Sequence, residues 1–389
     1  MGRRRLTKQQ RARIDQRQQQ IAQSFSENIQ ETDHSSNARA LESTEGSRLS
    51  GIVIRRYGAY ADVVEGAWSN RTHITSLQSK RCDIPARLQG DNATDDVVVG
   101  DEVVWENTEK QGQIIAIQPR HTTLIRWLTQ GRQAAVTSKS IGAQKVVAAN
   151  VTRVALVVAA EPKTPLLELD RALVSLESAG FAVTLVCNKC DLMPVEVEIC
   201  LQQSDATDFS ILTEEESSDS SWWLRLAWYQ QQGLELRFVS AVQRKGIDEL
   251  LQVFAHEIGI FSGPSGVGKS SLINALLQEE IARTGRLTEL SQHGAHTTSI
   301  SSLYVLPEDG FLIDSPGVRS FQFACPAVSE LSRSFLPFPK YIDQCRFSNC
   351  SHRVEPKCAV KAAVERGDIP AWRMSLYEKL WTEASQITS

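Results

Sequence analysis

The chain has 389 residues, a hydrophobic content of 41% and a formal net charge of −4. This length predicts two or three domains, and the apolar content is sufficient for their cores. A slightly negative charge excludes a global attraction to RNA, so nucleic-acid binding would need local basic patches. We find no apolar run of membrane-spanning length and no signal-peptide pattern, so we expect a cytoplasmic protein with no membrane partner.

The N-terminal arm, residues 1–48, has a biased composition. Its first 20 positions hold seven basic residues and a single acidic one, Asp15, and glutamines and serines follow. This composition predicts a disordered arm that folds on RNA. The alternative is a solvated tail without a partner.

Residues 49–118 are expected to form a small barrel. Apolar and polar residues alternate up to and beyond a turn at Gly58, and further strands are predicted at 97–105 and 112–117. Short strands with glycine turns favour a barrel. In an OB-type barrel, the first hairpin would carry basic and aromatic residues at a common RNA-binding position. These are Arg55, Arg56, Tyr57 and Tyr60. The two tyrosines could instead pack inside the barrel.

Residues 119–323 alternate strand and helix patterns, which predicts a doubly wound α/β sheet. Buried strands are expected at 154–160 and 181–187, with an amphipathic helix at 166–179. Between 204 and 221 there are six acidic and no basic residues, typical of a solvated insertion. The tryptophans that follow are expected to anchor a helix rather than bind a ligand. They are Trp222, Trp223 and Trp228.

A guanine-recognition loop is predicted at Asn188-Lys-Cys-Asp191, directly after a strand. The Asp191 carboxylate would accept the N1–H and N2–H₂ donors of guanine, whereas adenine presents a ring acceptor there. Lys189 would lay its aliphatic stem on the base, and Asn188 would tie the loop to the phosphate loop. Ser240 and Ala241 end another strand, and the Ala241 N–H is expected to donate to guanine O6.

A phosphate loop is predicted at 263–270, where G-x-x-x-x-G-K-[ST] stands between an apolar strand and an apolar helix. Its N–H groups and the helix N-terminus favour phosphate, Lys269 would be the β/γ-phosphate cation, and Ser270 would bind Mg²⁺. A chance glycine-rich turn is the alternative, which the flanking strand and helix disfavour. The expected nucleotide contacts are Gly263, Pro264, Ser265, Gly266, Val267, Gly268, Lys269, Ser270 and Ser271.

The strand at 311–314 ends in an Asp followed by Ser-Pro-Gly. Asp314 would hold Mg²⁺ through a bound water, and the Gly317 N–H would touch the γ-phosphate. Val318 stands where many GTPases have Gln, and it cannot orient the attacking water. His296, beside two threonines, is the best replacement. Its alternative role is a loop contact with rRNA.

The order of these motifs is reversed. Ordinary GTPases carry the phosphate loop first, whereas here the guanine motif precedes it by about 75 residues. This order predicts a circularly permuted GTPase. A nucleotide kinase fits less well, because N-K-x-D has no use there.

A closed metal site is predicted near the C-terminus, where three cysteines and one histidine occur as C-x4-C-x-H-x5-C. Three thiolates and an imidazole make a structural tetrahedral Zn²⁺ site with no open position for chemistry. Unrelated cysteines are the alternative. The predicted ligands are Cys345, Cys350, His352 and Cys358, and the expected free thiols are Cys82, Cys187, Cys190, Cys200 and Cys325.

These motifs resemble those of the small-subunit ribosome-biogenesis GTPases called RsgA or YjeQ. The resemblance covers nearly the whole chain from about residue 45. It rests on N-K-C-D at 188–191, S-A at 240–241, G-P-S-G-V-G-K-S-S at 263–271, H-T-T at 296–298, D-S-P-G-V at 314–318 and the Cys/His cluster.

The resemblance implies a multi-domain fold with an N-terminal OB-fold β-barrel, a circularly permuted P-loop α/β GTPase domain and a C-terminal zinc-binding helical extension. The expected boundaries are 1–48 for the arm, 49–118 for the barrel, 119–323 for the GTPase domain and 324–389 for the extension. The implied cofactors are GTP or GDP, Mg²⁺ and one Zn²⁺ per chain.

The resemblance also implies hydrolysis of GTP stimulated by the 30S ribosomal subunit, in late maturation, by a monomer that contacts 16S rRNA. Thr298 would coordinate Mg²⁺ in the closed state, so His296, Thr298 and Lys269 are the expected catalytic residues. The family loop reads G-R-H-T-T, but Ala295 replaces its Arg here. The alternative function is an RNA-bound placeholder whose nucleotide only locks its shape.

Overall fold

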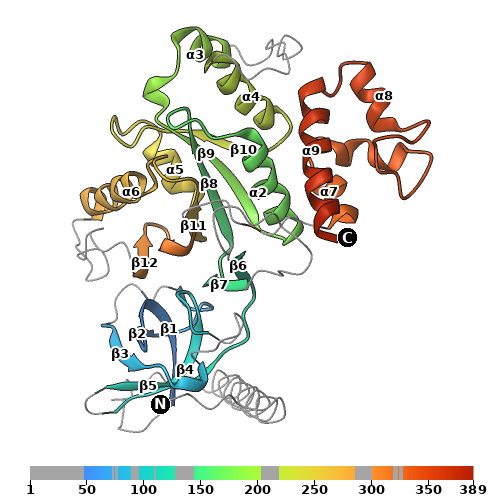
Figure 1. Cartoon of the computed structure of the whole chain (residues 1–389). Coiled ribbons are helices and arrows are strands. Elements are labelled where there is room, and N and C mark those ends of the chain that lie inside the picture. The colour runs from blue at the N-terminus through green and yellow to red at the C-terminus, as the bar shows by residue number, and fades with distance from the viewer. Residues whose placement is uncertain are drawn as a thin grey trace.

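The computed structural model describes residues 48–71, 74, 78–88, 96–108, 111–127, 144–202, 219–284, 300–318, 323 and 327–388. Three parts follow one another along the chain: a small barrel, an α/β unit and a helical C-terminal part (Figure 1). Residues 1–47 of the predicted arm, and the predicted catalytic His296 and Thr298, lie outside the described residues. Within the described ranges, no helix is long and apolar enough to cross a membrane.

Five strands close into the N-terminal barrel. They are β1 (Arg48–Tyr57), β2 (Tyr60–Glu65), β3 (Lys80–Asp83), β4 (Glu102–Glu106) and β5 (Gly112–Ile117). β1 pairs with β2 and β4, β2 with β3, β3 with β5, and β5 with β4, so the ring is complete. This closure is consistent with an OB fold. Gly51 leaves space for the side chains inside the barrel, because a Cβ at this position would lie only 2.5 Å from the Val63 side chain and 2.6 Å from the Trp105 side chain.

The strand expected at 97–105 is shorter in the structure, since β4 begins only at Glu102. A buried carboxylate explains the turn before it. Asp101 is fully buried, accepts the Val98 N–H at 2.8 Å and pairs with Arg120 at 2.7 Å. A buried charge needs such partners. The backbone therefore folds back at 97–101, where the residue pattern alone predicted extended chain.

A separate hairpin links the barrel to the α/β unit. β6 (Thr123–Trp127) and β7 (Gln144–Ala149) pair antiparallel. The main chain of the barrel holds the end of β7, because Ala149 N donates to Val99 O at 3.1 Å. Next to it, the Asn150 side chain donates to Gly100 O at 2.9 Å. The strand and helix alternation predicted from residue 119 did not include this hairpin.

The α/β unit is built on strands in the order β10-β9-β8-β11-β13-β12. All neighbours are parallel except β12 and β13. The strands are β8 (Arg153–Ala159), β9 (Ala182–Asn188), β10 (Glu235–Phe238), β11 (Ile258–Ser262), β12 (Ser301–Leu306) and β13 (Gly310–Asp314). Side chains of β8 alternate between two apolar clusters, one on each face of the sheet. Such a sheet must be covered by helices on both faces.

Among the described residues, five helices cover the two faces. They are α2 (Leu166–Ser178), α3 (Val195–Gln202), α4 (Asp219–Gln231), α5 (Ile247–Val253) and α6 (Lys269–Thr284). α2 and α4 contribute to one apolar cluster, and α5 and α6 to the other. All three tryptophans of α4 are buried, which confirms their expected role as helix anchors. Of the acidic insertion predicted at 204–221, residues 204–218 lie outside the described residues.

The barrel and the α/β unit share one sheet. β12 pairs antiparallel with β1, with Arg55 opposite Ser302 and Arg56 opposite Ser301, so 11 strands are connected. Side chains reinforce the joint, because the Trp68 ring lies 5.2 Å from that of Phe311. β1 is therefore a member of both the barrel and the larger sheet.

The C-terminal part consists of α7 (Val328–Ser334), α8 (Ala359–Glu365) and α9 (Ala371–Thr388), with a loop before α8. α7 and α9 pack against α2. At their centre Arg373 is fully buried and pairs with Asp170 of α2 at 2.6 Å. Tyr229 of α4 completes the group, donating to Asp170 and accepting from Arg373, each at 2.8 Å.

Candidate nucleotide and metal sites

The predicted nucleotide motifs follow four strand ends, and parallel register brings these ends to one edge of the sheet. Ala159 lies opposite Asn188, Phe238 opposite Cys187, and Ile260 opposite Ile313. Open α/β sheets bind ligands at the carboxyl ends of their strands. The guanine loop, the Ser-Ala pair, the phosphate loop and the Asp314 motif are thus gathered from distant parts of the chain.

The phosphate loop curls between buried β11 and α6. Gly266 and Gly268 have φ values of 87° and 95°, which residues that carry a Cβ atom rarely adopt. Space is also restricted, since a Cβ on Gly268 would lie 2.3 Å from Asn188 Nδ2. Lys269 Nζ lies inside the curl, 2.6 Å from the carbonyl oxygens of Gly263 and Pro264. The loop therefore has the backbone shape and the cation that a phosphate needs.

Asn188 connects three of the motifs through its buried side chain. Its Nδ2 donates to Val267 O of the phosphate loop at 2.9 Å, and its Oδ1 accepts the Ala241 N–H at 3.2 Å. The tie expected between the guanine loop and the phosphate loop is thus present in the structure. The Ala241 N–H, which we expected at guanine O6, has Asn188 as its acceptor here.

The guanine loop is shaped by its backbone. Lys189 adopts a left-handed conformation with a φ of 62°, and its Nζ donates to the Glu161 carbonyl. Asp191 is exposed at the same edge, where its carboxylate can meet a base. Ser240 is buried, and a pair of backbone hydrogen bonds with Lys245 closes the turn that follows it. Glu161 gave no signal in the sequence, because only its carbonyl takes part.

The Asp314 motif ends β13 and is fastened to the start of β12. The hydroxyl oxygens of Ser301 and Ser315 lie 3.0 Å apart. Gly317 lies in a short 3-10 helix, η5 (Pro316–Val318). Val318 is only 3% exposed and packs in the apolar core, so it cannot position a water at the γ-phosphate. The Ser301–Ser315 contact was not predicted, because no local pattern marks Ser301.

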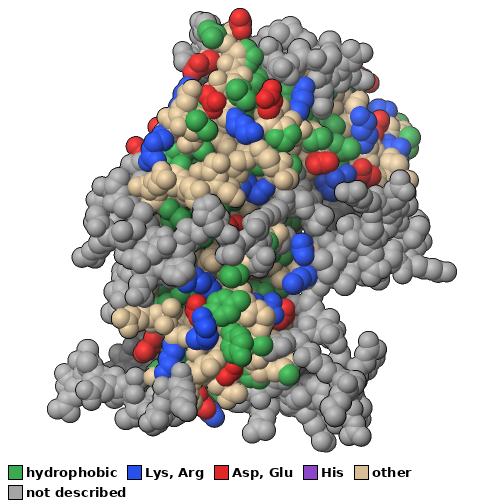
Figure 2. Space-filling view, turned by 60° about the vertical axis from the view of Figure 1, so that its left-hand side comes forward, with side chains coloured by type: hydrophobic (Ala, Val, Ile, Leu, Met, Phe, Trp, Pro, Cys, Tyr) green, Lys and Arg blue, Asp and Glu red, His purple; other side chains and the backbone are tan. Residues whose placement is uncertain are grey.

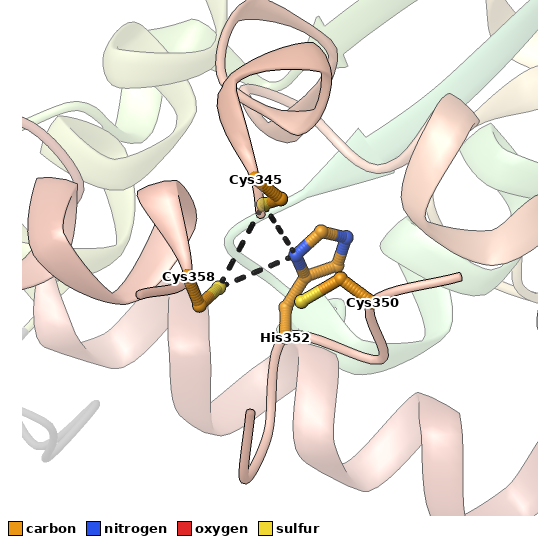
Figure 3. Close-up of side chains that lie close together, drawn as sticks. All are labelled: Cys345, Cys350, His352 and Cys358. Atoms are coloured by element: carbon orange, nitrogen blue, oxygen red, sulfur yellow. Dashed lines mark hydrogen bonds between the residues drawn. The ribbon is translucent and has the colours of Figure 1, made fainter. Parts of the chain in front are cut away.

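The four predicted metal ligands converge on one point (Figure 3). Their ligand atoms all lie within 4.8 Å of one another. His352 Nδ1 is 3.6 Å from Cys345 Sγ and 3.4 Å from Cys358 Sγ, and those two sulfurs are 4.0 Å apart. A tetrahedral Zn²⁺ with bonds of about 2.3 Å to sulfur and about 2.0 Å to nitrogen needs separations of roughly 3.5–3.8 Å. The donor set therefore suits zinc, and the two nitrogen–sulfur separations lie near these values, while the sulfur–sulfur separation is slightly longer.

The protonation of this cluster also suits a metal. Burial lowers the pKa of His352, which keeps the imidazole neutral and able to bind through Nδ1. Burial raises the pKa of the Cys350 thiol to about 12, and the neighbouring cysteines add to the effect. Without an ion these groups are therefore protonated thiols, and a metal would bind here by displacing their protons.

The loop around the cluster is held by its own hydrogen bonds. The Glu355 carboxylate accepts the backbone N–H groups of Ser351, Arg353 and Val354. Burial raises the pKa of Glu355, but these hydrogen bonds outweigh it and bring the pKa to about 2. Tyr377 OH donates to Ser351 O at 3.1 Å, which joins the loop to α9. The ligands are thus positioned by a loop that is itself anchored.

Comparison with known proteins decides the family. The sequence pattern of the RsgA GTPase family matches residues 129–324. The chain belongs to the RsgA GTPase family. It is 34% identical to the small ribosomal subunit biogenesis GTPase RsgA of Chromohalobacter salexigens, with 98% of each chain covered. It is 32% identical to the protein of that name from Histophilus somni, over 100% of this chain and 98% of the relative.

Solved structures agree in fold. YjeQ from Thermotoga maritima superposes with a TM-score of 0.60 at 25% identity, covering 87% of this chain and 99% of that one. YloQ, described as a circularly permuted GTPase, gives a TM-score of 0.60 over 90% and 98% of the chains. As a member of the RsgA GTPase family, the protein is a GTP hydrolase, for which guanine nucleotide and Mg²⁺ are implied. Its fold is that of the circularly permuted GTPases. The predicted fold class is confirmed.

Proposed function

We propose that this GTPase hydrolyses GTP when it docks on the small ribosomal subunit, and that it acts in late maturation of that subunit. Full-length relatives carry the name of small ribosomal subunit biogenesis GTPases. The observation that carries the proposal is the position of Asn188. It ties the guanine loop to the phosphate loop and to Ala241, so base recognition and phosphate binding belong to one site.

Each motif has a role in this proposal. The N–H groups of residues 263–271 hold the phosphates, Lys269 neutralises their charge, and Ser270 binds Mg²⁺. Asp314 holds the metal through a water, and the Gly317 N–H meets the γ-phosphate. Asp191 selects guanine and Lys189 covers the base. The proposal is supported by the shared sheet edge and by the exposed position of Asp191.

Hydrolysis needs a group that orients water, and buried Val318 leaves that role to another residue. We assign it to His296, with Thr298 on Mg²⁺, although both lie outside the described residues. Their segment runs directly into β12, which pairs with the barrel strand β1. Contact of the barrel with 16S rRNA would thus be transmitted through β12 to the residues that we assign to hydrolysis.

We also propose one structural Zn²⁺ per chain, held by the four ligands of the C-terminal loop. The short sulfur and nitrogen separations and the neutral His352 support this assignment. The ion would leave no open position, so it stabilises the loop and takes no part in hydrolysis. We propose a cytoplasmic monomer, as a ribosome-assembly role requires access to the subunit.

The decisive measurement is GTP turnover with added 30S, 50S and 70S particles. Stimulation by 30S alone is expected. The matched variants are His296→Ala, which should keep GTP and 30S affinity but lose roughly tenfold or more of the stimulated rate, and Lys269→Ala, which should lose nucleotide binding. Turnover that stays negligible on every particle would instead favour the RNA-bound placeholder. Equal stimulation of the His296 variant and wild type would remove that residue from the mechanism.

A further inference from the structure

A basic cavity of about 580 Å³ lies where the barrel, the β6–β7 hairpin and the segment after β13 meet. Within the part of the chain that the structure describes, three cationic residues line it: Arg56 of β1, Arg126 of β6 and Lys145 of β7. None of the described residues that line it is acidic. On a chain whose net charge is −4, such a concentration of positive charge is local. In Figure 2, Lys and Arg side chains lie across the middle of the molecule, interspersed with hydrophobic and acidic side chains.

Two of the cations are placed where their like charges repel each other, which destabilises the protein when the cavity is empty. Arg126 and Lys145 lie directly opposite each other in the β6–β7 ladder. Directly opposed residues share a face of the ladder, and like charges there repel. Arg56 donates to Asp96 at 2.6 Å through one nitrogen, while its Nε is buried without an acceptor among the described residues. An anion in the cavity would offset the repulsion and supply an acceptor.

The same cavity borders the nucleotide site. Ser301, Ser315 and Pro316 line it, and the Ser301 and Ser315 hydroxyls are 3.0 Å apart. Ser315 directly follows Asp314, the predicted metal-site residue. Ser301 lies opposite Arg56 in the β1–β12 ladder. A ligand held by the three cations would therefore touch both segments that lead into the γ-phosphate region.

The surroundings favour a polyanion with bases over a small free anion. Tyr57 and Gly58 of the β1–β2 turn line the cavity, and the Arg81 guanidinium lies 5.0 Å from the centre of the Tyr57 ring. Tyr60, on the same turn, is 43% exposed. Aromatic rings beside cations are the usual elements for stacking bases and following a phosphate backbone. The cavity is thus continuous with a surface suited to RNA.

We propose that this cavity binds a backbone phosphate of RNA, and that its occupancy acts on the Asp314 segment through Ser301 and Ser315. The inference rests on the proposed function, because it takes the RNA from the small ribosomal subunit. It assigns a specific contact at which RNA binding is coupled to the nucleotide site.

The test compares two double variants that remove equal charge. Arg126→Gln with Lys145→Gln empties the cavity of two cations, and Arg366→Gln with Lys379→Gln removes two exposed cations from the C-terminal part. Affinity for purified 30S subunits is measured against salt with a non-hydrolysable GTP analogue, and turnover at saturating 30S. A short RNA hairpin and inorganic pyrophosphate are titrated separately onto the GDP-loaded protein.

The cavity variant should lose roughly tenfold or more in 30S affinity and lower the salt slope by about 1–2, with the control nearly unchanged. Its saturated turnover should fall, while GTP-analogue affinity without subunits stays at the wild-type value. The RNA hairpin should also bind more weakly. Identical behaviour of the cavity and control variants would overturn the site, and full turnover at saturation would overturn the coupling.

Failure of the proposed function has a different signature. In that case wild-type protein would neither bind 30S subunits nor hydrolyse GTP faster in their presence. A comparison of RNA-hairpin affinity between wild type and the cavity variant would still show whether the cavity holds an RNA phosphate. If the cavity cations affect pyrophosphate binding but not RNA binding, the ligand is a free phosphate and the RNA assignment is wrong.

Discussion

The two ends of the GTPase unit are joined to their neighbours by different kinds of contact. The barrel is attached largely through main chain, by the pairing of β1 with β12 and by the hydrogen bond from Ala149 N to Val99 O. The C-terminal helices are attached through side chains, around the buried pair of Arg373 and Asp170. Between those helices and the sheet, the described residues form no ladder.

The difference has a mechanical consequence. A ladder links the backbone positions of two parts, so a shift of β12 moves β1 with it. A buried side-chain cluster fixes one orientation, because every partner is needed to satisfy the charge. Arg373 also lies 4.0 Å from the centre of the Phe335 ring and donates to Leu336 O. We infer that the barrel joint transmits motion and that the C-terminal joint is rigid.

The largest expected effect comes from removing the metal. Cys350→Ser should abolish binding of about one Zn²⁺ per chain. The C-terminal loop would then lose the stabilisation that metal binding provides, on the order of 10 kcal/mol. GTP affinity should survive, since the phosphate loop belongs to the other core. Metal analysis and hydrogen exchange check this. A metal-free native protein with a protected C-terminal loop would contradict the zinc assignment.

The next effect tests the rigid joint. Arg373→Met should lower the free energy of unfolding by about 3–5 kcal/mol, because the Asp170 carboxylate stays buried without its cation. Arg171→Met is the matched control, since its pair with Glu383 is partly exposed and should cost about 1 kcal/mol or less. Urea denaturation measures both. Equal losses would show that burial of the Arg373 pair carries no special weight.

The third effect is a pH dependence at the same joint. Burial on α2, together with Asp170, raises the pKa of Glu177 to about 7, although Arg373 opposes the shift. A carboxyl with a raised folded-state pKa favours the folded state at low pH, and that stability is lost as pH rises from about 4.5 towards 7. Glu177→Gln should remove this decline and stabilise the protein at pH 8 by on the order of 1–3 kcal/mol. The check is the melting temperature of both proteins from pH 5 to pH 8. Parallel curves of melting temperature against pH would contradict the prediction.

The smallest effect is expected at the barrel joint. Arg71 donates to the His256 carbonyl across this joint, and Arg71→Gln should cost about 1 kcal/mol, since the β1–β12 ladder remains. The measurement is again urea denaturation, with Arg48→Gln as an exposed control on the barrel. A loss as large as that of Arg373→Met would remove the distinction between the two joints.

Much of the candidate site could be predicted because its chemistry is written in short contiguous motifs. The phosphate loop needs glycines at positions of positive φ, and Gly266 and Gly268 satisfy this locally. The zinc ligands lie within one loop, so their spacing alone predicted a closed site. The roles of His296 and Thr298 stay predictions, as these residues lie outside the described chain.

What sequence reasoning missed depends on partners that are distant in the chain. The turn at 97–101 exists because buried Asp101 pairs with Arg120. The Ala241 N–H meets Asn188, and the β6–β7 hairpin interrupts a pattern that looked like alternating strands and helices. None of these contacts has a local signal.

The reversed order of nucleotide motifs, the Cys/His cluster and the basic and aromatic hairpin can be recognised without a structure, because each depends only on groups that lie close along the chain. Folding brings β1 into both the barrel and the larger sheet, places Arg373 against Asp170, and lines one cavity beside Ser315 with Arg56, Arg126 and Lys145. Residues so far apart in sequence meet through packing and register, whose energies depend on the whole fold.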